Sequence, residues 1–390
     1  MRRLMLLVAV LCAVSASAAD RPSPRIESVV PAEKQPWAGN QATIFYDNFD
    51  GPDSTQSVYM EPKPGTPNAA RSKEHALGGT GMSMELLYPA GKADGIGNRK
   101  LVFGDAPVGR PVRRGERFDE VYWRIYVKHQ PGWRGNPAKM SRATSLTSGK
   151  WQQAFIAHVW GGDGDTLTLD PVRNVKDGQV TTTRYNDFRN FGRWLGNKPS
   201  GKFPVHSTEE SGRWICVESR LKLNTPGKAD GENQLWVDGA LDAERKNLDL
   251  RGTYTAHTIN AIFLEAYWNE GSPVDQKRWY DEFVVSTRPI GPIVASATPT
   301  ILKRPSEGAA AWQVEVQSGG DERKLVWQGN ETAVKEPTAK LTLDTTTGKF
   351  VGELEGKKSF APGTYFLRCR EKSADGTWTD WSPWHQPFAR

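Results

Sequence analysis

Alternation of apolar and polar side chains, with a period of two, runs through much of this chain. In residues 122–128, three apolar side chains alternate with two tyrosines and two cations. Such a period is typical of a β-strand that is buried on one face. The other face would present Tyr122, Arg124, Tyr126 and Lys128. We predict that the first face belongs to the core and that the second forms part of a binding site.

Residues 214–223 and 260–269 show the same period, and each predicts a strand with one apolar face. The opposite face of the first carries Glu218, Arg220 and Lys222. The opposite face of the second carries Phe263, Glu265 and Tyr267. After residues 234–237, Asp238-Gly239 supplies the positive φ that a tight hairpin turn requires. These patterns predict antiparallel sheets in which one face is apolar and the other polar.

Helical periodicity is scarce, and 38 Gly and 26 Pro separate the alternating runs. This composition predicts an all-β protein. The length of 390 residues is enough for two domains. Prolines interrupt the pattern around residues 291–308, which we predict to be a linker. It would join a larger β-sandwich, residues 19–290, to a smaller one of immunoglobulin size, residues 309–390.

The first 18 residues have the three parts of a secretory signal peptide. Arg2 and Arg3 precede the apolar residues 4–14, and small residues follow up to Ala18. We expect cleavage there and a secreted or periplasmic protein. No later stretch approaches the roughly 20 apolar residues that span a bilayer, so we expect no stable membrane insertion. The two remaining cysteines, Cys216 and Cys369, fall in different predicted domains and are expected to be buried free thiols.

The charge balance argues against a nucleic-acid partner. Of the 51 basic residues two lie in the predicted leader, which leaves a net charge of about +4 against 45 acidic residues. Basic residues are nevertheless clustered locally, because residues 133–142 combine a Trp with Arg134, Lys139 and Arg142. A basic, aromatic strand and loop suit an acidic polysaccharide as the partner. We expect the protein itself to be a monomer. The alternative is a solvated face on which long cationic side chains cover apolar surface.

Four segments carry a resemblance to a known family: residues 122–144, 151–160, 212–239 and 278–292. They resemble the concanavalin A-like β-jelly-roll sandwich of secreted bacterial proteins. More narrowly, they are similar to polysaccharide lyases of families 14 and 20, whose members cleave uronic acid polymers such as alginate and glucuronan. The resemblance covers most of residues 45–292. Jelly rolls also host lectins and hydrolases, so the implied activity is less specific than the implied fold.

β-Elimination on a uronate needs a group that neutralises the carboxylate, a base and an acid. The resemblance implies Lys139 as the counterpart of the family's cleft lysine, although the Pro-Gly that should follow is missing. Our hypothesis takes Arg124 as carboxylate clamp, His158 or Lys139 as base, and Tyr126 as acid with Tyr185 in reserve. Substrate contacts are expected from Lys128, Arg142, Gln152, Gln153, Tyr185, Glu218, Arg220, Glu265 and Tyr267.

Each of these residues also has a structural interpretation. A lone histidine at the end of an apolar strand is more often hydrogen-bonded to backbone than catalytic. Glu218 and Arg220 could form an ion pair within one strand face. A glycoside hydrolase would need two carboxylates on a shared face, for which Glu218 and Glu265 are the candidates. A carbohydrate-binding module without catalysis is the second alternative.

We expect no cofactor for catalysis. A structural Ca²⁺ is a further hypothesis, because paired terminal strands hold this ion in many jelly rolls. Its candidate ligands are Asp47, Asp50 and Asp281. Carboxylate oxygens suit calcium, but no EF-hand spacing accompanies them.

The last segment, residues 365–384, resembles the final hairpin of a fibronectin type III domain. Trp378, Trp381 and Trp384 repeat every third residue beside a strand that carries arginines. Arginine and tryptophan faces can stack in a ladder. We therefore predict a structural role for these rings rather than sugar binding.

Overall fold

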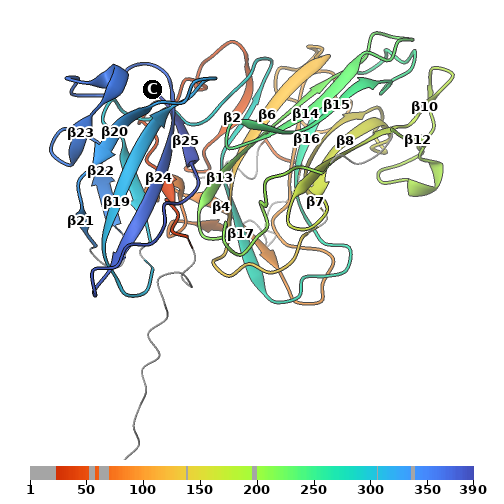
Figure 1. The fold of residues 1–390 in the computed structure, drawn as a ribbon. Helices are drawn as coiled ribbons and strands as arrows, with labels where there is room; N and C mark the ends of the chain where they lie inside the picture. Colours follow the sequence, from red (N-terminus) through yellow and green to blue (C-terminus); the bar gives the residue numbers. More distant parts are fainter. Residues whose placement is uncertain are drawn as a thin grey trace, which may run out of the picture.

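The computed structural model describes residues 23–51, 58–60, 70–137, 139–195, 200–304, 306–334 and 339–390. The predicted signal peptide, residues 1–18, lies outside this range. Within it, no helix is long and apolar enough to cross a membrane. Strands dominate, as predicted, and build two β-sandwiches that lie side by side (Figure 1). The described part of the chain is therefore all-β and sandwich-like, as predicted.

One sheet of the larger sandwich contains eight strands among the described residues, in the order β15-β14-β13-β6-β17-β4-β3, with β2 beside β17. They are β2 (Thr43–Asp47), β3 (Arg71–Ser72), β4 (Ser83–Tyr88), β6 (Glu120–His129), β13 (Trp214–Lys222), β14 (Gly231–Val237), β15 (Ala240–Leu248) and β17 (Gln276–Ser286). We call this the back sheet. Its neighbouring strands are antiparallel, and β6 lies between β13 and β17.

The opposing sheet, called the front sheet here, has the order β12-β9-β8-β7-β16-β5. Its strands are β5 (Arg99–Val102), β7 (Lys139–Leu146), β8 (Gln153–Gly161), β9 (Leu167–Arg173), β12 (Arg193–Trp194) and β16 (Ala261–Tyr267). A two-stranded ribbon, β10 (Val175–Lys176) and β11 (Gln179–Val180), follows β9. The short 3-10 turn η3 (Phe188–Asn190) lies between the ribbon and β12.

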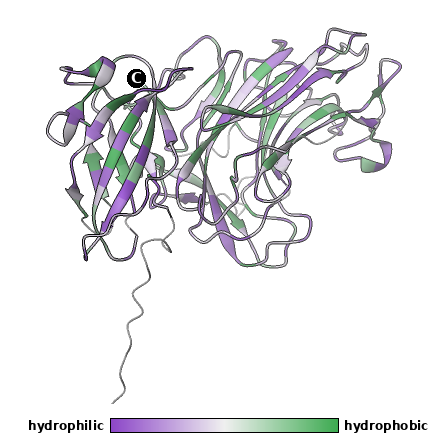
Figure 2. Ribbon diagram, viewed as in Figure 1, coloured by the Kyte–Doolittle hydropathy of each residue, from purple (hydrophilic) through white to green (hydrophobic). Residues whose placement is uncertain are grey.

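The core of the larger sandwich lies between the two sheets, where apolar faces meet. Trp123, Ile125 and Val127 enter it from β6. Ile262, Leu264 and Ala266 enter it from β16. Hydrophilic and hydrophobic positions alternate along the strands (Figure 2). The core faces predicted for residues 122–128, 214–223 and 260–269 are thus confirmed. Asp238 and Gly239 have φ values of 47° and 77°, which confirms the predicted hairpin between β14 and β15.

The smaller sandwich pairs a sheet of order β23-β20-β19-β24-β25 with a sheet of order β1-β18-β22. Its strands are β1 (Ser28–Val29), β18 (Thr300–Lys303), β19 (Ala309–Ser318), β20 (Leu325–Gly329), β21 (Thr332–Ala333), β22 (Ala339–Thr342), β23 (Gly348–Phe350), β24 (Thr364–Ser373) and β25 (His385–Ala389). The turns η2 (Leu77–Gly79) and η4 (Gly352–Leu354) complete the elements. The stretch predicted as a linker therefore contains a paired strand, β18, whose partner β1 comes from the other end of the chain.

The predicted ladder of cations and tryptophans lies on β24. The Arg368 guanidinium is 4.7 Å from the Trp381 ring centroid and 4.5 Å from that of Trp384. Arg370 lies 4.6 Å from the rings of both Trp378 and Trp381. The tryptophans thus pack on the strand itself, as the structural interpretation requires. The resemblance of this region to fibronectin type III stays a prediction.

The outer face of β6, predicted to form a binding site, is instead covered by the linker and the smaller sandwich. Arg124 donates to the backbone oxygens of Gly291 (3.0 Å) and Glu282 (3.1 Å). The Tyr126 hydroxyl accepts from the backbone N–H of Ile293 (2.9 Å). Lys128 forms an ion pair with Glu27. The prediction that this face binds substrate is wrong, because the alternation defines two faces but does not say what covers each.

The neighbouring strand β13 shows the same correction. Glu218 accepts hydrogen bonds from the backbone N–H groups of Ile290 (2.8 Å) and Gly291 (2.7 Å). Arg220 bonds instead to Glu120 and Glu232, each at 2.7 Å. Both side chains therefore hold structure on the back sheet. The predicted Glu218–Arg220 ion pair is not among these contacts.

The thiols of Cys216 and Cys369 are buried and form no disulfide, as predicted. Burial raises the pKa of Cys216 to about 12 and that of Cys369 to about 11. Neither thiol is therefore ionised at neutral pH, and neither is prepared for nucleophilic chemistry.

The fully buried Arg124 gives a first test. Replacement by Ala removes three hydrogen bonds and leaves the buried Glu282 carboxylate without its cation. We expect Arg124→Ala to lower the free energy of unfolding by about 3–5 kcal/mol in urea titrations. The exposed Arg114→Ala should change it by less than about 0.5 kcal/mol. Equal stability of the two variants would contradict the structural role of Arg124.

Candidate active site

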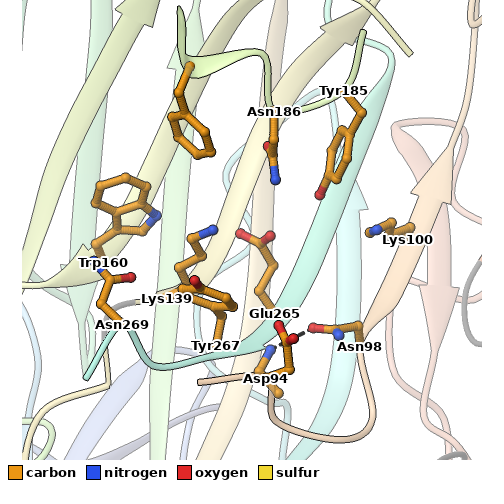
Figure 3. A pocket seen from close by; sticks show the side chains of 12 residues that line it. Asp94, Asn98, Lys100, Lys139, Trp160, Tyr185, Asn186, Glu265, Tyr267 and Asn269 are labelled. Atoms are coloured by element: carbon orange, nitrogen blue, oxygen red, sulfur yellow. Dashed lines mark hydrogen bonds between the residues drawn. The ribbon is translucent and has the colours of Figure 1, made fainter. Parts of the chain in front are cut away.

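A pocket of about 450 Å³ opens on the outer face of the front sheet, away from the back sheet (Figure 3). Strands β5, β7, β8 and β16 form its floor, and the segment between β11 and β12 forms one wall. The lining residues are Asp94, Asn98, Lys100, Lys139, Trp160, Tyr185, Asn186, Phe188, Glu265, Ala266, Tyr267 and Asn269. Charged and aromatic side chains thus meet in a single concave site, the arrangement typical of ligand pockets.

Lys139, the first residue of β7, lies at the centre of the pocket floor. Its ammonium is 4.2 Å from the ring centroid of Tyr267 and 5.9 Å from that of Trp160. Burial lowers the pKa of Lys139, and the cations Arg142 and Lys100 lower it further, while Glu265 opposes the shift. A lysine whose pKa is lowered spends more time as the neutral amine, which can accept a proton.

Arg142 organises the groups around Lys139. This buried guanidinium donates to Glu265 Oε1 (2.6 Å) and to Asn186 Oδ1 (3.0 Å). It also donates to the hydroxyl of Tyr185. In register, Arg142 lies between Phe263 on β16 and His158 on β8. One side chain of the sheet therefore holds a carboxylate and two residues of the wall segment in place.

Lys100 comes from β5 and approaches the same wall. Its ammonium lies 4.7 Å from the ring centroid of Tyr185 and 5.2 Å from that of Trp151. Together with Lys139 and Arg142 it gives the site three cations, against the carboxylates of Glu265 and Asp94. The site carries an excess of one positive charge while Lys139 is protonated and none when Lys139 is neutral, so Lys100 is the cation left to meet a ligand carboxylate, because Arg142 is already paired with Glu265.

His158 lies under the pocket rather than on its surface. Its Nδ1 is 2.9 Å from the backbone oxygen of Asp170. Its ring packs 3.9 Å from the centroid of Trp160. Only 1% of the residue is exposed. These contacts match the structural interpretation of His158, whose ring packs against that of Trp160.

The two predicted glutamines hold the wall segment. Gln152 donates to the backbone oxygen of Thr182 (2.6 Å), and Gln153 donates to Thr144 Oγ1 (3.1 Å). The backbone N–H of Asn186 donates to Gln153 Oε1 (3.3 Å). Neither glutamine lines the pocket, so we assign them a role in positioning Tyr185 and Asn186.

The hypothesis that one cleft joins Arg124, Tyr126, Lys139 and His158 is wrong. The first two lie on the far side of the back sheet, together with Lys128, Glu218 and Arg220. Five predicted residues do meet at the pocket: Lys139, Arg142, Tyr185, Glu265 and Tyr267. The last two share the outer face of β16, as the alternation predicted.

Sequence reasoning missed Lys100, Asn98, Asp94 and Phe188. Lys100 lies in a strand of four residues, β5, in which all residues are buried and no alternation of polarity marks a face. Asp94 and Asn98 lie in a turn-rich segment before it. Only the basic, aromatic composition of residues 183–194 could have pointed to Phe188.

The structure does not bring all three predicted calcium ligands to one pocket. Asp47 accepts from the Tyr59 hydroxyl (2.9 Å) and the backbone N–H of Phe49 (2.7 Å). Asp50 and Asp281 line another pocket, of about 160 Å³. Burial, with the nearby charges of Glu282 and Asp50, raises the pKa of Asp281 well above its usual value. Among the described residues, no three His, Cys, Asp or Glu side chains are grouped to hold a metal ion.

No protein-family model matches this chain, and neither does any curated protein sequence. Among solved structures, the endo-β-1,4-glucuronan lyase from Trichoderma reesei is similar over 63% of this chain and 96% of its own, at 17% identity and a TM-score of 0.41. The PL-14 alginate lyase from Aplysia kurodai is similar over 57% and 87%, at 16% identity and a TM-score of 0.39. The alginate lyase vAL-1 from Chlorella virus covers 53% and 85%, at 13% identity and a TM-score of 0.39. At these identities and TM-scores the likeness carries no conclusion about this chain.

The lowered pKa of Lys139 predicts a dependence of stability on pH. Between that pKa and the ordinary lysine value of 10.5, the unfolded chain binds more protons at this residue than the folded chain does. Stability therefore rises with pH across this window, by at most about 1.4 kcal/mol per pH unit. Lys139→Met should remove this contribution, which urea titrations from neutral pH upward would measure. Parallel curves for the two proteins would contradict the lowered pKa.

Calcium binding stays a prediction with a direct measurement. If Asp50 and Asp281 hold the ion with backbone or amide oxygens, chelator should lower the melting temperature, and added Ca²⁺ should restore it. Asp281→Asn should then melt at the same temperature with and without chelator. If the parent protein melts at the same temperature with and without chelator, the calcium hypothesis is contradicted.

Proposed function

We propose that this protein is a polysaccharide lyase that cleaves a uronic acid polymer by β-elimination at the pocket of Lys139. The observation that carries the proposal is a buried lysine of lowered pKa that shares a cation-rich pocket with two tyrosines. Such a pocket combines a base, phenol groups and positive charge for a carboxylate, the three needs of this reaction.

Lys139 is the base in this proposal. Its neutral amine takes the proton from C5 of the uronate, next to the carboxylate. The electron pair of that C–H bond forms the C4–C5 double bond, and the C4–O4 bond breaks. The Tyr185 hydroxyl supplies the proton to the departing O4 oxygen. The products are a new reducing end and an unsaturated uronate at the new non-reducing end.

Positive charge beside the carboxylate makes the C5 proton acidic enough to remove. Lys100 lies at the same wall as Tyr185 and takes this role in place of Arg124. Asn98 adds an amide donor on the pocket wall, while its oxygen accepts from the backbone N–H of Ala266 (2.7 Å). Arg142 acts through its partners, because it positions the Tyr185 hydroxyl and holds Glu265.

The hydrolase alternative loses its carboxylate pair. Glu218 lies on the back sheet and accepts from the backbone N–H groups of Ile290 and Gly291, whereas Glu265 lies in the pocket of the front sheet. The two carboxylates cannot act on one glycosidic bond. A binding protein without catalysis remains the alternative, since the same cations and rings would hold an acidic sugar.

Absorbance separates elimination from binding, because each cleavage creates an enoate. We expect the protein to increase ultraviolet absorbance on at least one of a panel of alginate, glucuronan and related uronans. Lys139→Met should lower the rate by roughly 10²–10⁴-fold, the usual contribution of a general base. The exposed Lys228→Met serves as the matched control and should retain the parent rate.

Two results would count against the proposal. Binding of uronans without any growth in absorbance would favour the non-catalytic alternative. Elimination that persists at the parent rate in Lys139→Met would show that another group is the base. Tyr185→Phe, which keeps the ring but removes the hydroxyl, tests the assigned acid in the same assay.

A further inference from the structure

Aromatic rings continue beyond the pocket in an unbroken series, which we call the aromatic strip: Trp160, Trp194, Phe191 and Phe188. The ring centroids of Trp160 and Trp194 are 6.0 Å apart, those of Trp194 and Phe191 are 5.9 Å apart, and those of Phe191 and Phe188 are 4.9 Å apart. Trp160 and Phe188 also line the pocket. Both ends of the strip therefore border the candidate active site, and its middle rings, Trp194 on β12 and Phe191, lie beyond the pocket lining.

Two of the four rings of the strip are unusually exposed. Phe188 is 58% exposed and Trp194 is 42% exposed. Across the described residues, the one other large hydrophobic side chain of comparable exposure is Leu241 on β15, in the back sheet. Exposed apolar rings that gather at one place indicate a binding surface.

Hydrogen bonds hold the strip in shape without a ligand. Asp187 accepts from the Thr183 hydroxyl (2.6 Å) and from Asn190 Nδ2 (2.8 Å), which closes the turn that carries Phe188. Thr181 Oγ1 donates to the backbone oxygen of Asn190 (2.8 Å). Further along, β12 pairs with β9, which attaches Trp194 to the front sheet. A preformed surface of this kind loses little conformational freedom on binding.

Positive charge accompanies the rings. Arg184, Arg189 and Arg193 are all exposed and alternate with the aromatic residues of this segment. Asp187, the acidic residue between them, is buried in the hydrogen bonds of its own turn. The surface therefore offers apolar rings for sugar faces and guanidinium groups for carboxylates.

From this combination we infer that the aromatic strip binds further sugar units of an acidic polysaccharide, outside the pocket and on its β12 side. The inference rests on the proposed function for the identity of the polymer. It adds where the polymer lies on the protein surface. Because the strip extends the pocket across the surface, the protein holds several consecutive units. It then cleaves within long chains and favours them over short oligosaccharides.

Length-dependent binding tests the inference. Dissociation constants are measured by calorimetry for uronate oligosaccharides of increasing length, with Lys139→Met as the parent so that cleavage is slow. Affinity should rise with length, and Trp194→Ala should weaken binding of the longest chains by about tenfold or more, the size of an interface hot spot. Leu241→Ala, which removes an equally exposed apolar side chain from the back sheet, is the matched control and should bind like its parent.

A second variant tests the contribution of positive charge to binding. Arg193→Ala should weaken binding of long chains more at low salt than at high salt, because ionic strength screens exposed charges. Arg114→Ala, an exposed arginine elsewhere, should have no such effect. A neutral polysaccharide of similar length, such as a glucan, should gain less from the strip than a uronan does.

The outcomes distinguish this inference from the proposed function. Affinity for long uronans that is unchanged in both Trp194→Ala and Arg193→Ala overturns the strip, whatever the lyase assay shows. Length-dependent binding that both variants lose, in a protein that yields no enoate, supports the strip and overturns the lyase. If Trp194→Ala melts below the control, Arg193→Ala decides, since an exposed arginine carries little packing.

Discussion

The buried ion pair between Arg142 and Glu265 is the interaction on which the candidate site depends. It joins β7 to β16 within the front sheet, and the same guanidinium reaches Tyr185 and Asn186 on the wall segment. Because a buried charge without its partner is costly, these groups keep one geometry. Burial lowers the pKa of Lys139, and the cations Arg142 and Lys100 lower it further against the opposing effect of Glu265.

Period-two alternation predicted the two faces of each long strand correctly, yet it misassigned the function of one of them. The outer face of β6 has the composition of a binding site, but its Arg124 and Tyr126 bond to backbone groups of residues more than 150 positions later. Contacts across such distances leave no local trace in the sequence. By contrast, Glu265 and Tyr267 were assigned to the correct face, because the outer face of β16 carries no covering sheet.

The site residues also divide into those that local composition indicates and those that only contacts between distant segments bring together. Lys139, Arg142 and Tyr185 belong to segments in which cations and rings are dense, so their composition marked them. Lys100 lies in a short strand that is buried throughout, and its place beside Tyr185 comes from the pairing of β5 with β16. Register between strands, rather than any motif, brings these groups together. Some residues of such a site can be predicted from the sequence. The order of the strands in the sheet decides which other residues join them.

The two sandwiches share apolar surface, and this has a consequence for how the protein can be divided. Tyr126, Trp214 and Trp279 from the back sheet belong to the same buried cluster as Trp312 and Val316 from the smaller sandwich. Strand β1, near the start of the described chain, completes a sheet of that second unit. A fragment that ends at the linker would leave tryptophans facing water and β1 without a neighbour. The smaller sandwich is thus a structural half of the protein, and shortened forms that omit it should aggregate.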